Sequence, residues 1–117
     1  MSGAIGYNAG LAAEDIVAAR YAELGCGVSA QRWRGARGEI DLIVEDGDVT
    51  VFVEVKKSRD FASAAARLSN RQMQRIYASA EGYLASSPGG MNSNARFDVA
   101  LVNGQGAVEI LENAFGQ

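Results

Sequence analysis

The sequence of 117 residues contains no histidine, a single cysteine (Cys26) and no apolar run near the roughly 20 residues of a membrane span. Without histidine, Ser-His-Asp triads, Cys-His pairs and His-ligated zinc sites are all excluded. One cysteine cannot form an internal disulfide bond, which fits a reducing compartment. Any catalysis must therefore use carboxylates, lysine, hydroxyl groups or a metal ion that prefers oxygen ligands.

The first residues, MSGAIGYN, lack both the basic start and the apolar core of a signal peptide. Together with the lack of a membrane span, this predicts a soluble cytoplasmic protein with no membrane partner. The composition, 48% hydrophobic and 21% charged, is that of a globular chain. The length allows one hydrophobic core, so we expect a single domain over residues 1–117.

The net charge of −3 argues weakly against a protein that binds nucleic acid over its whole surface. Basic residues nevertheless gather between residues 55 and 75, where Asp60 is the single acid. They are Lys56, Lys57, Arg59, Arg67, Arg71 and Arg75. A local patch of this kind suits a phosphate backbone, and a solvated helix face is the alternative explanation.

Hydrophobic periodicity and turn residues predict the order of the elements. We expect a helix over residues 9–24, a strand over 27–33, a β-hairpin over 38–57, a small-residue connection over 61–69, a helix over 70–86, and strands over 95–102 and 107–111. The first helix would be capped by Asn8 and ended by Gly25. Its apolar stripe would contain Val17, Tyr21 and Leu24.

Acidic residues interrupt the apolar runs of the hairpin, GEIDLIV and TVFVEVKK. Because side chains alternate along a strand, Asp41 would share a face with Glu39 and Ile43, and Ile40 would point to the other face. By the same rule Glu54 would share a face with Lys56. The hairpin therefore predicts acidic and basic groups on one face of the sheet.

The distance between Asp41 and Glu54 depends on the hairpin turn. A two-residue turn at Asp46-Gly47 would set Asp41 opposite Phe52, whereas a four-residue turn would set it opposite Glu54. Either register puts the two carboxylates on one face, roughly 5–8 Å apart at Cβ. A divalent cation with oxygen ligands would relieve their repulsion.

A ribbon with one face in water would also carry charges at alternate positions. Two features count against that explanation. The run VFVEV is apolar on both sides of Glu54, as in a strand covered on both faces, where an unpaired charge is costly. Glu14 lies on the apolar stripe of the first helix and would be carried toward the sheet. We therefore expect a polar pocket at the edge of the core, as in many active sites.

An acidic residue followed by Glu-x-Lys in the next strand resembles the PD-(D/E)xK nuclease superfamily; here the elements are Asp41 in GEID and Glu54-Val55-Lys56. The chain is also similar, over nearly its whole length, to the YraN-like family of small uncharacterised bacterial proteins. The motifs that carry this resemblance are GLAAED, RWRGARGEIDLIVEDGDVTVFVEVK, a helix with RI and YL, and RFDVALV. It implies an α/β fold with a restriction-endonuclease-like core, a mixed β-sheet with flanking helices in the order α-β-β-β-α-β-β.

The resemblance also implies roles for individual residues. Asp41 and Glu54 would ligate Mg²⁺ (Mn²⁺ is an alternative), helped by the carbonyl of Val55. Lys56 would orient or activate the attacking water and stabilise the developing charge on phosphorus. Glu14 matches a position where Holliday-junction-resolvase-like relatives have a further acid.

The second helix of the family usually has a lysine where this chain has Gln72, so one phosphate-facing charge is missing or is replaced by a neighbouring arginine. The remaining basic patch gives the expected nucleic-acid contacts. They are Lys57, Arg59, Arg67, Arg71 and Arg75.

Other residues allow more than one interpretation. Glu39 is either a site residue, a group that supports the site, or a partner of Arg37. Asp98 is expected to accept hydrogen bonds near Arg96 rather than to bind metal. Trp33 is expected to pack in the core or at a strand edge, with stacking on a nucleobase as the alternative.

The leading hypothesis is a metal-dependent nuclease that hydrolyses phosphodiester bonds in DNA, which is favoured over RNA, with branched or damaged DNA as candidate substrates. The second is a protein of nuclease fold that binds nucleic acid or a partner without cutting. The third is a small structural subunit. A lone domain of this size contacts only a short duplex segment, which makes a homodimer an open alternative.

Overall fold

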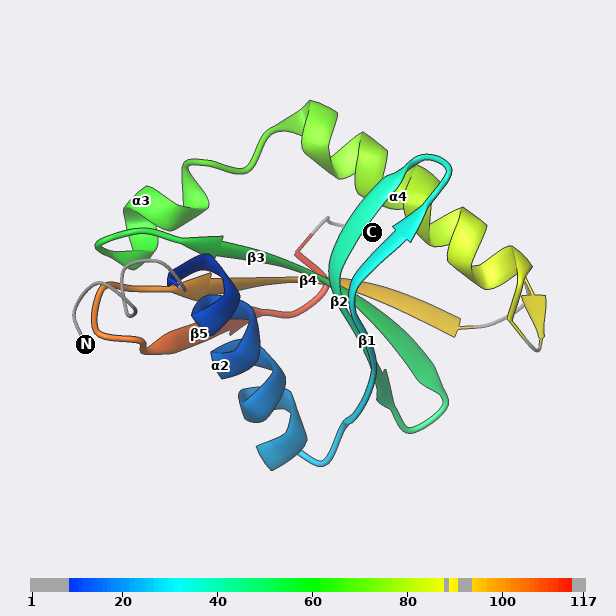
Figure 1. Ribbon diagram of the computed structural model, residues 1–117, viewed down its shortest axis with the longest axis horizontal. Coiled ribbons are helices and arrows are strands. Elements are labelled where there is room, and N and C mark those ends of the chain that lie inside the picture. Colours follow the sequence, from blue (N-terminus) through cyan, green and yellow to red (C-terminus); the bar gives the residue numbers. More distant parts are fainter. Residues whose placement is uncertain (1–8, 88, 91–93, 115–117) are drawn as a thin grey trace.

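The computed structural model of the protein describes residues 9–87, 89–90 and 94–114. The elements in this part of the chain are α2 (Ala9–Glu23), β1 (Gly27–Gly35), β2 (Gly38–Asp46), β3 (Val49–Lys57), α3 (Phe61–Ala65), α4 (Asn70–Ala85), β4 (Asn94–Val102) and β5 (Val108–Leu111) (Figure 1). No helix within these ranges is long and apolar enough to cross a membrane.

The strands form one five-stranded mixed sheet in the order β1-β2-β3-β4-β5. Strands β3 and β4 run parallel, and the other neighbouring pairs are antiparallel. The parallel pair needs a crossover connection, which α3 and α4 supply. The predicted mixed α/β architecture and the order of its main elements are confirmed.

The segment expected to be a small-residue connection contains the short helix α3. Asp60 caps it, because its carboxylate accepts a hydrogen bond from the amide of Ser63 at 2.7 Å. Ser69 caps α4 in the same way, with its hydroxyl 3.2 Å from the amide of Gln72. The expected cap of the first helix, Asn8, lies outside the described residues.

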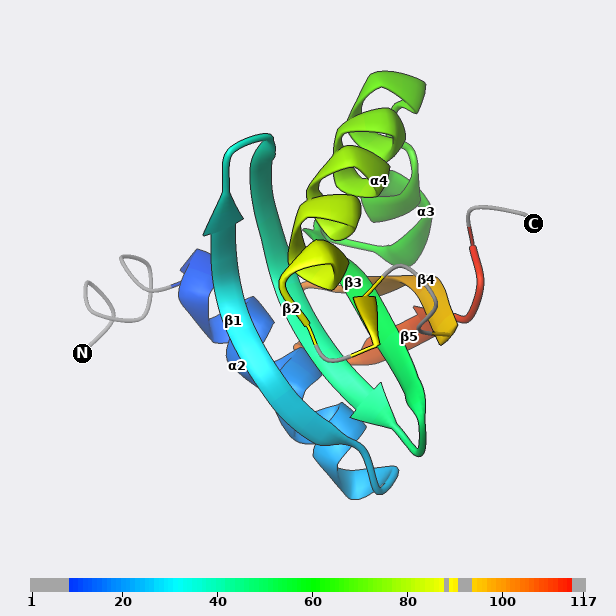
Figure 2. The same cartoon turned by 90° about the vertical axis from the view of Figure 1, so that its right-hand side faces the viewer.

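The helices cover the two faces of the sheet (Figure 2). Val17 and Tyr21 of α2 pack on one face, against a cluster that includes Val44 and Val53. The other face packs against α4 through a cluster of Ile40, Ile43, Phe52, Ala80 and Leu84. The run from Val51 to Val53 is fully buried, so the central strand is covered on both faces, as its continuous apolar sequence predicts.

Two local predictions are wrong. Leu24 is 56% exposed, because α2 ends at Glu23 and the chain turns at Gly25, whose φ is +92°. The hairpin turn consists of Gly47 and Asp48 instead of Asp46 and Gly47, since Asp46 still pairs with Val49 and Gly47 has a φ of +63°. The register is therefore the one expected for a four-residue turn, in which the next pair would be Asp41 and Glu54, although the turn has two residues.

Candidate functional site

The site lies where β2 and β3 part. Their backbone pairing runs from Asp46 and Val49 to Leu42 and Val53, and one further step would bring Asp41 opposite Glu54. Beyond this point Asp41 Oδ2 accepts a hydrogen bond from the amide of Val55 at 2.9 Å. A side chain thus replaces a backbone partner, and the β1–β2 hairpin bends away from β3 (Figure 1).

The bend breaks the alternation of side chains along β2. Ile40 and Ile43 pack in the same cluster under α4, although strict alternation would point them to opposite faces. On β1, Arg32 has a φ of +53° between Gln31 and Trp33, which pair with Leu42 and Ile40. The expectation that Ile40 faces away from Ile43 is therefore wrong, and Asp41 stands between the two faces of the sheet.

Glu54 is buried on β3, with 7% of its surface exposed. Its Oε2 lies 2.9 Å from Lys56 Nζ and accepts a hydrogen bond from Gln72 Nε2 on α4 at 3.0 Å. The pKa of Glu54 is raised to about 7, first by burial and then by the charge of Asp41. The lysine and the amide therefore offset only part of the cost of burying this carboxylate.

Asp41 and Glu54 line the same two cavities, and the charge of Asp41 acts on Glu54. The pKa of Asp41 is also raised by burial, although the Val55 amide and Lys56 act in the opposite direction. The half-buried Asp41 and the buried Glu54 therefore favour a shared proton, or a further cation in addition to Lys56.

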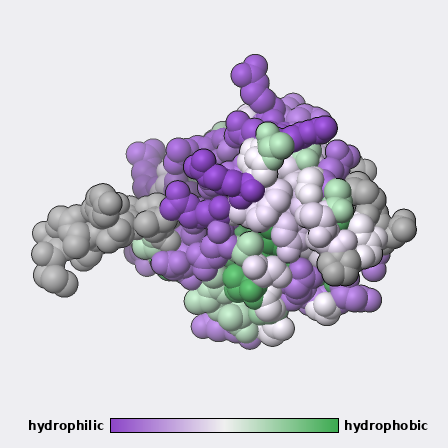
Figure 3. Space-filling model, turned by 45° about the vertical axis from the view of Figure 1, so that its right-hand side comes forward, coloured by the Kyte–Doolittle hydropathy of each residue, from purple (hydrophilic) through white to green (hydrophobic). Residues whose placement is uncertain are grey.

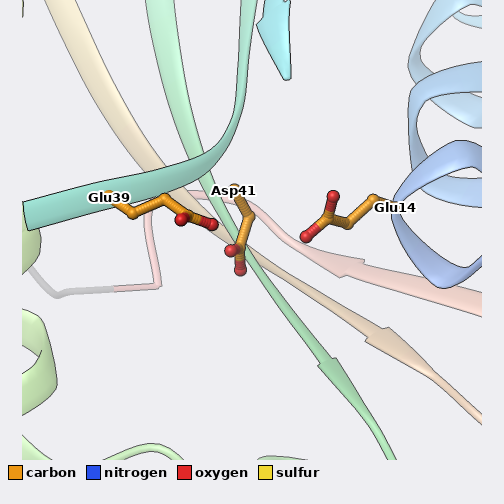
Figure 4. Close-up of side chains that lie close together, drawn as sticks. All are labelled: Glu14, Glu39 and Asp41. Carbon is orange, nitrogen blue, oxygen red and sulfur yellow. The ribbon is translucent and has the colours of Figure 1, made fainter. Parts of the chain in front are cut away.

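Glu14 faces the hairpin from α2. Its carboxylate oxygens lie close to those of Asp41 and Glu39, such that one oxygen from each lies within 4.8 Å of the others (Figure 4). Burial, followed by the charge of Asp41, raises the pKa of Glu14 to about 7. Its Oε1 is buried and has no hydrogen-bond partner among the described residues.

Glu39 is paired at the outer side of this cluster. It lies 3.2 Å from Arg34 and 3.9 Å from Arg32, while Arg37 is 3.9 Å from Glu81 on α4. The proposed pairing of Glu39 with Arg37 is therefore wrong. Sequence reasoning gave Glu39 little weight, although its alternation with Asp41 already placed the two carboxylates on one face.

Two cavities open on these carboxylates. One, of about 430 Å³, is lined by Glu39, Gln72 and Arg75 as well as by Asp41 and Glu54. The other, of about 340 Å³, lies on the side of α2. Its lining includes Glu14, Val55, Lys56 and Lys57, together with the same two acids and Gln72. Asp41 and Glu54 are therefore accessible from both sides of the parting strands.

The donor set suits a hard divalent cation. Carboxylates from α2, β2 and β3 converge, and one buried oxygen lacks a partner among the described groups. Val55 contributes its amide N–H, which holds Asp41. The predicted contribution of its carbonyl stays a prediction, as do the ligand roles of Asp41, Glu54 and Glu14.

Of the five basic residues expected to contact nucleic acid, two line the cavities and three lie elsewhere on the surface. Lys57 and Arg75 line the two cavities. Arg67 donates a hydrogen bond to the carbonyl of Lys57 at 2.9 Å, and Arg59, with an 89% exposed side chain, pairs with Asp60. Arg71 is exposed on α4. Figure 3 shows hydrophilic residues gathered over the upper part of one face, above a paler and greener region.

Sequence reasoning missed two residues that contact this region. Arg34 lines the cavity beside Glu39, and the basic segment RWRGARG was the signal that could have indicated it. Gln72 was noted only as a departure from the family pattern, yet its amide binds Glu54 directly. Nothing in the local sequence shows that the first turn of α4 lies over β3.

Asp98 lies outside the site. It is fully buried and accepts hydrogen bonds from Arg96 Nε at 3.0 Å and from the hydroxyl of Tyr21 at 2.7 Å. The amide of Asn113 is a further donor, at 2.9 Å. The expectation that Asp98 accepts hydrogen bonds near Arg96 is confirmed.

The model of a family described as "Uncharacterised protein family UPF0102" matches residues 13–102. A UPF0102 protein of Cereibacter sphaeroides is 56% identical over 115 residues, which cover 98% of each chain. One from Ruegeria pomeroyi is 56% identical over 92% of this chain and 88% of its own, and one from Dinoroseobacter shibae is 46% identical over 89% and 78%. The matched residues include both parting strands and α4.

Proposed function

The chain belongs to the UPF0102 family, as its YraN-like motifs indicate. From the geometry of its site, we propose that it is a metal-dependent hydrolase of phosphodiester bonds in nucleic acid, with DNA preferred to RNA. The observation that supports this most is the convergence of Asp41 and Glu54, with Lys56, at the point where β2 and β3 part. A restriction-endonuclease-like nuclease needs this combination of two acids and an amine at one place on the sheet.

Asp41, Glu54 and Glu14 would hold Mg²⁺ or Mn²⁺, with the Val55 carbonyl as the further ligand that the resemblance implies. Such an ion polarises a phosphoryl oxygen and lowers the pKa of a bound water. The raised pKa values of the two glutamates fit this role, because deprotonated ligands become favourable once a cation is bound.

Lys56 supplies the remaining positive charge. Its side chain is 14% exposed and its ammonium group holds Glu54 at 2.9 Å, so it is oriented before substrate arrives. An ammonium group has three donors, so the same group can also orient a water molecule or an oxygen on phosphorus. Charge that develops on phosphorus would be stabilised by this fixed cation.

Arg34, Arg75 and Lys57 stand at the two cavities and would contact the phosphates on either side of the reacting one. Arg59, Arg67 and Arg71 would extend this contact along the strand. A DNA substrate is consistent with a cytoplasmic location, and two copies of the chain would contact a longer duplex than one.

One observation favours a second candidate function, binding without cleavage. Gln72 is neutral and occupies Glu54 Oε2 together with Lys56. In the resemblance to the family this position usually carries a lysine. A protein that lacks this charge would still bind DNA through its arginines.

The test is cleavage of labelled duplex, single-stranded and branched DNA by the purified protein, with Mg²⁺, with Mn²⁺ and with EDTA. We expect cleavage only with a metal ion, and a loss of at least about 10²-fold in Asp41→Asn, Glu54→Gln and Lys56→Met, since each removes a group that acts on the reacting atoms. Glu23→Gln is the matched control, because Glu23 is an exposed acid that pairs only with Arg20 among the described residues. Equal cleavage by parent and variants would overturn the proposal, and DNA binding without cleavage would favour the second candidate.

A further inference from the structure

A third cavity, of about 440 Å³, lies beside the site, between the end of the β1–β2 hairpin and α4. Ala78, Gly82 and Ala85 form its wall on the helix, and these small side chains leave the space open. The hairpin contributes Trp33 and Gly35. The size is within the usual range for pockets that bind small organic groups, about 300–1,000 Å³.

Trp33 is fixed in this wall. Its ring meets Tyr83 edge to face, with centroids 5.4 Å apart and planes at 88°. It also lies against Gly35 so closely that a Cβ there would come within 2.4 Å of the ring, so only glycine fits. A Cβ at Gly82 on α4 would stand 3.9 Å from the same atom of the ring. The wall of the pocket therefore combines a rigid aromatic group with the helix backbone beside it.

Ser79 supplies a polar group at the base of the pocket. It is 1% exposed, and its hydroxyl has no hydrogen-bond partner among the described residues. The hydroxyl lies under the hairpin, where a Cβ at Gly38 would be 3.1 Å away. A buried hydroxyl without a partner is unfavourable, and a ligand with a donor or acceptor that reached it when the hairpin moves aside would remove that cost.

The rim of the pocket is charged and can open. Arg37 on the hairpin turn and Glu81 on α4 pair across it at 3.9 Å, and both side chains are more than 60% exposed. Such an exposed pair contributes little to stability. Gly35 also lines the cavity of Asp41 and Glu54, so the pocket borders the candidate active site.

We propose that this pocket receives one unpaired nucleobase of the substrate, whose neighbouring phosphate lies at Asp41 and Glu54. Among ligands of a phosphodiesterase, a base next to the reacting phosphate combines a flat aromatic face, hydrogen-bonding edges and an attached anion. These match Trp33, Ser79 and the arginines of the adjoining cavity, respectively. The position of the phosphate rests on the proposed function. The substrate class is then DNA with a base outside the stack, as at a bulge, a branch point or a single-stranded end.

Binding measured in EDTA tests this without any need for cleavage. The probes are two fluorescein-labelled duplexes with a one-nucleotide bulge, one carrying a base at the bulge and the other an abasic analogue. We expect the base-bearing DNA to bind about tenfold more tightly, as one stacked base contributes. It should also quench the fluorescence of Trp33, which is the sole tryptophan of the chain.

Gly82→Leu fills the pocket and removes no contact, and leucine favours the helix more than glycine does. This variant should bind both duplexes with the affinity of the abasic one, whereas Ala19→Leu, at an exposed position of α2, should keep the preference. Ser79→Ala should reduce the preference about threefold and leave the melting temperature unchanged or higher.

Equal affinity of the parent for the two duplexes, or an unchanged preference in Gly82→Leu, would overturn the pocket. The outcomes also separate the two proposals. Metal-dependent cleavage without a base preference rejects only the pocket, and a base preference without cleavage rejects only the catalytic assignment. If neither duplex binds, both proposals fail.

Discussion

The neighbouring strands β3 and β4 each bury an acidic residue, Glu54 and Asp98, and the surroundings of the two residues have opposite charge. Asp98 on β4 receives hydrogen bonds from Arg96, from the hydroxyl of Tyr21 and from the amide of Asn113. Glu54 on β3 lies beside the half-buried carboxylate of Asp41, and its pKa is raised to about 7. Both are buried charges, so burial alone does not identify a functional acid.

The difference lies in the partners. Asp98 is surrounded by hydrogen-bond donors, from Tyr21, Arg96 and Asn113. Its carboxylate in turn raises the pKa of Arg96 through their hydrogen bonds. Around Asp41 and Glu54, further carboxylates from Glu14 and Glu39 add negative charge. The first arrangement stabilises the metal-free fold, and the second stabilises it only when a proton or a cation is added.

Removal of the structural acid should have the largest effect. Asp98→Ala leaves the guanidinium of Arg96 and the hydroxyl of Tyr21 without their buried acceptor, so we expect the free energy of unfolding to fall by about 3–5 kcal/mol. Urea denaturation followed by circular dichroism measures this. The exposed Asp48→Ala should change it by less than about 0.5 kcal/mol. A loss below about 1 kcal/mol for Asp98→Ala would contradict the contrast between the two acids.

Neutralising the acids of the site should leave the metal-free fold intact. In EDTA, Asp41→Asn keeps an acceptor for the Val55 amide and relieves repulsion, so its melting temperature should equal or exceed that of the parent. Mg²⁺ at about 100 times its Kd should stabilise the parent by about 2.7 kcal/mol and should not stabilise the variant. A parent that does not respond to Mg²⁺, with a variant that melts many degrees lower in EDTA, would make these carboxylates structural.

The dependence of stability on pH should separate the two regions further. Glu54 has a pKa of about 7 in the folded state and 4.5 ordinarily, so between these values the folded state holds a proton that the unfolded state has lost. Stability of the metal-free protein should therefore fall as pH rises from about 4.5 to 7, by at most about 1.4 kcal/mol per pH unit for this group. Urea denaturation across this range in EDTA measures the slope. It should be shallower in Glu54→Gln, and a slope of opposite sign would contradict the assignment.

The smallest expected effect concerns the basic residues. Arg75→Gln removes a charge at the cavity of Asp41 and Glu54, whereas Arg59→Gln removes one that pairs with Asp60 in solvent. Fluorescence anisotropy with a short duplex should show a severalfold loss of affinity for Arg75→Gln and a salt dependence reduced by about one phosphate contact. Arg59→Gln should change affinity less, and equal effects would mean that contact extends over the whole basic patch.

The sequence contained enough information for the order of the elements and for the shared location of Asp41 and Glu54, because both follow from periodicity and a turn signal. It did not contain the break of alternation at Asp41, since that depends on a side chain that bonds to the next strand. The position of Gln72 over Glu54 depends on how α4 crosses the sheet, and the bond from Tyr21 to Asp98 joins residues 77 positions apart. Local patterns carry no information on such contacts.

The hydrogen bond between the Val55 amide and Asp41 has a consequence for motion. That amide belongs to the central strand, but it is held by a side chain of the hairpin that bends away. Its proton can therefore exchange with solvent deuterium whenever the hairpin swings outward, without any opening of the pairing between β3 and β4. The exchange rate of this single amide would measure how often the entrance to the carboxylates opens, and a cation that draws Asp41 and Glu54 together would slow it.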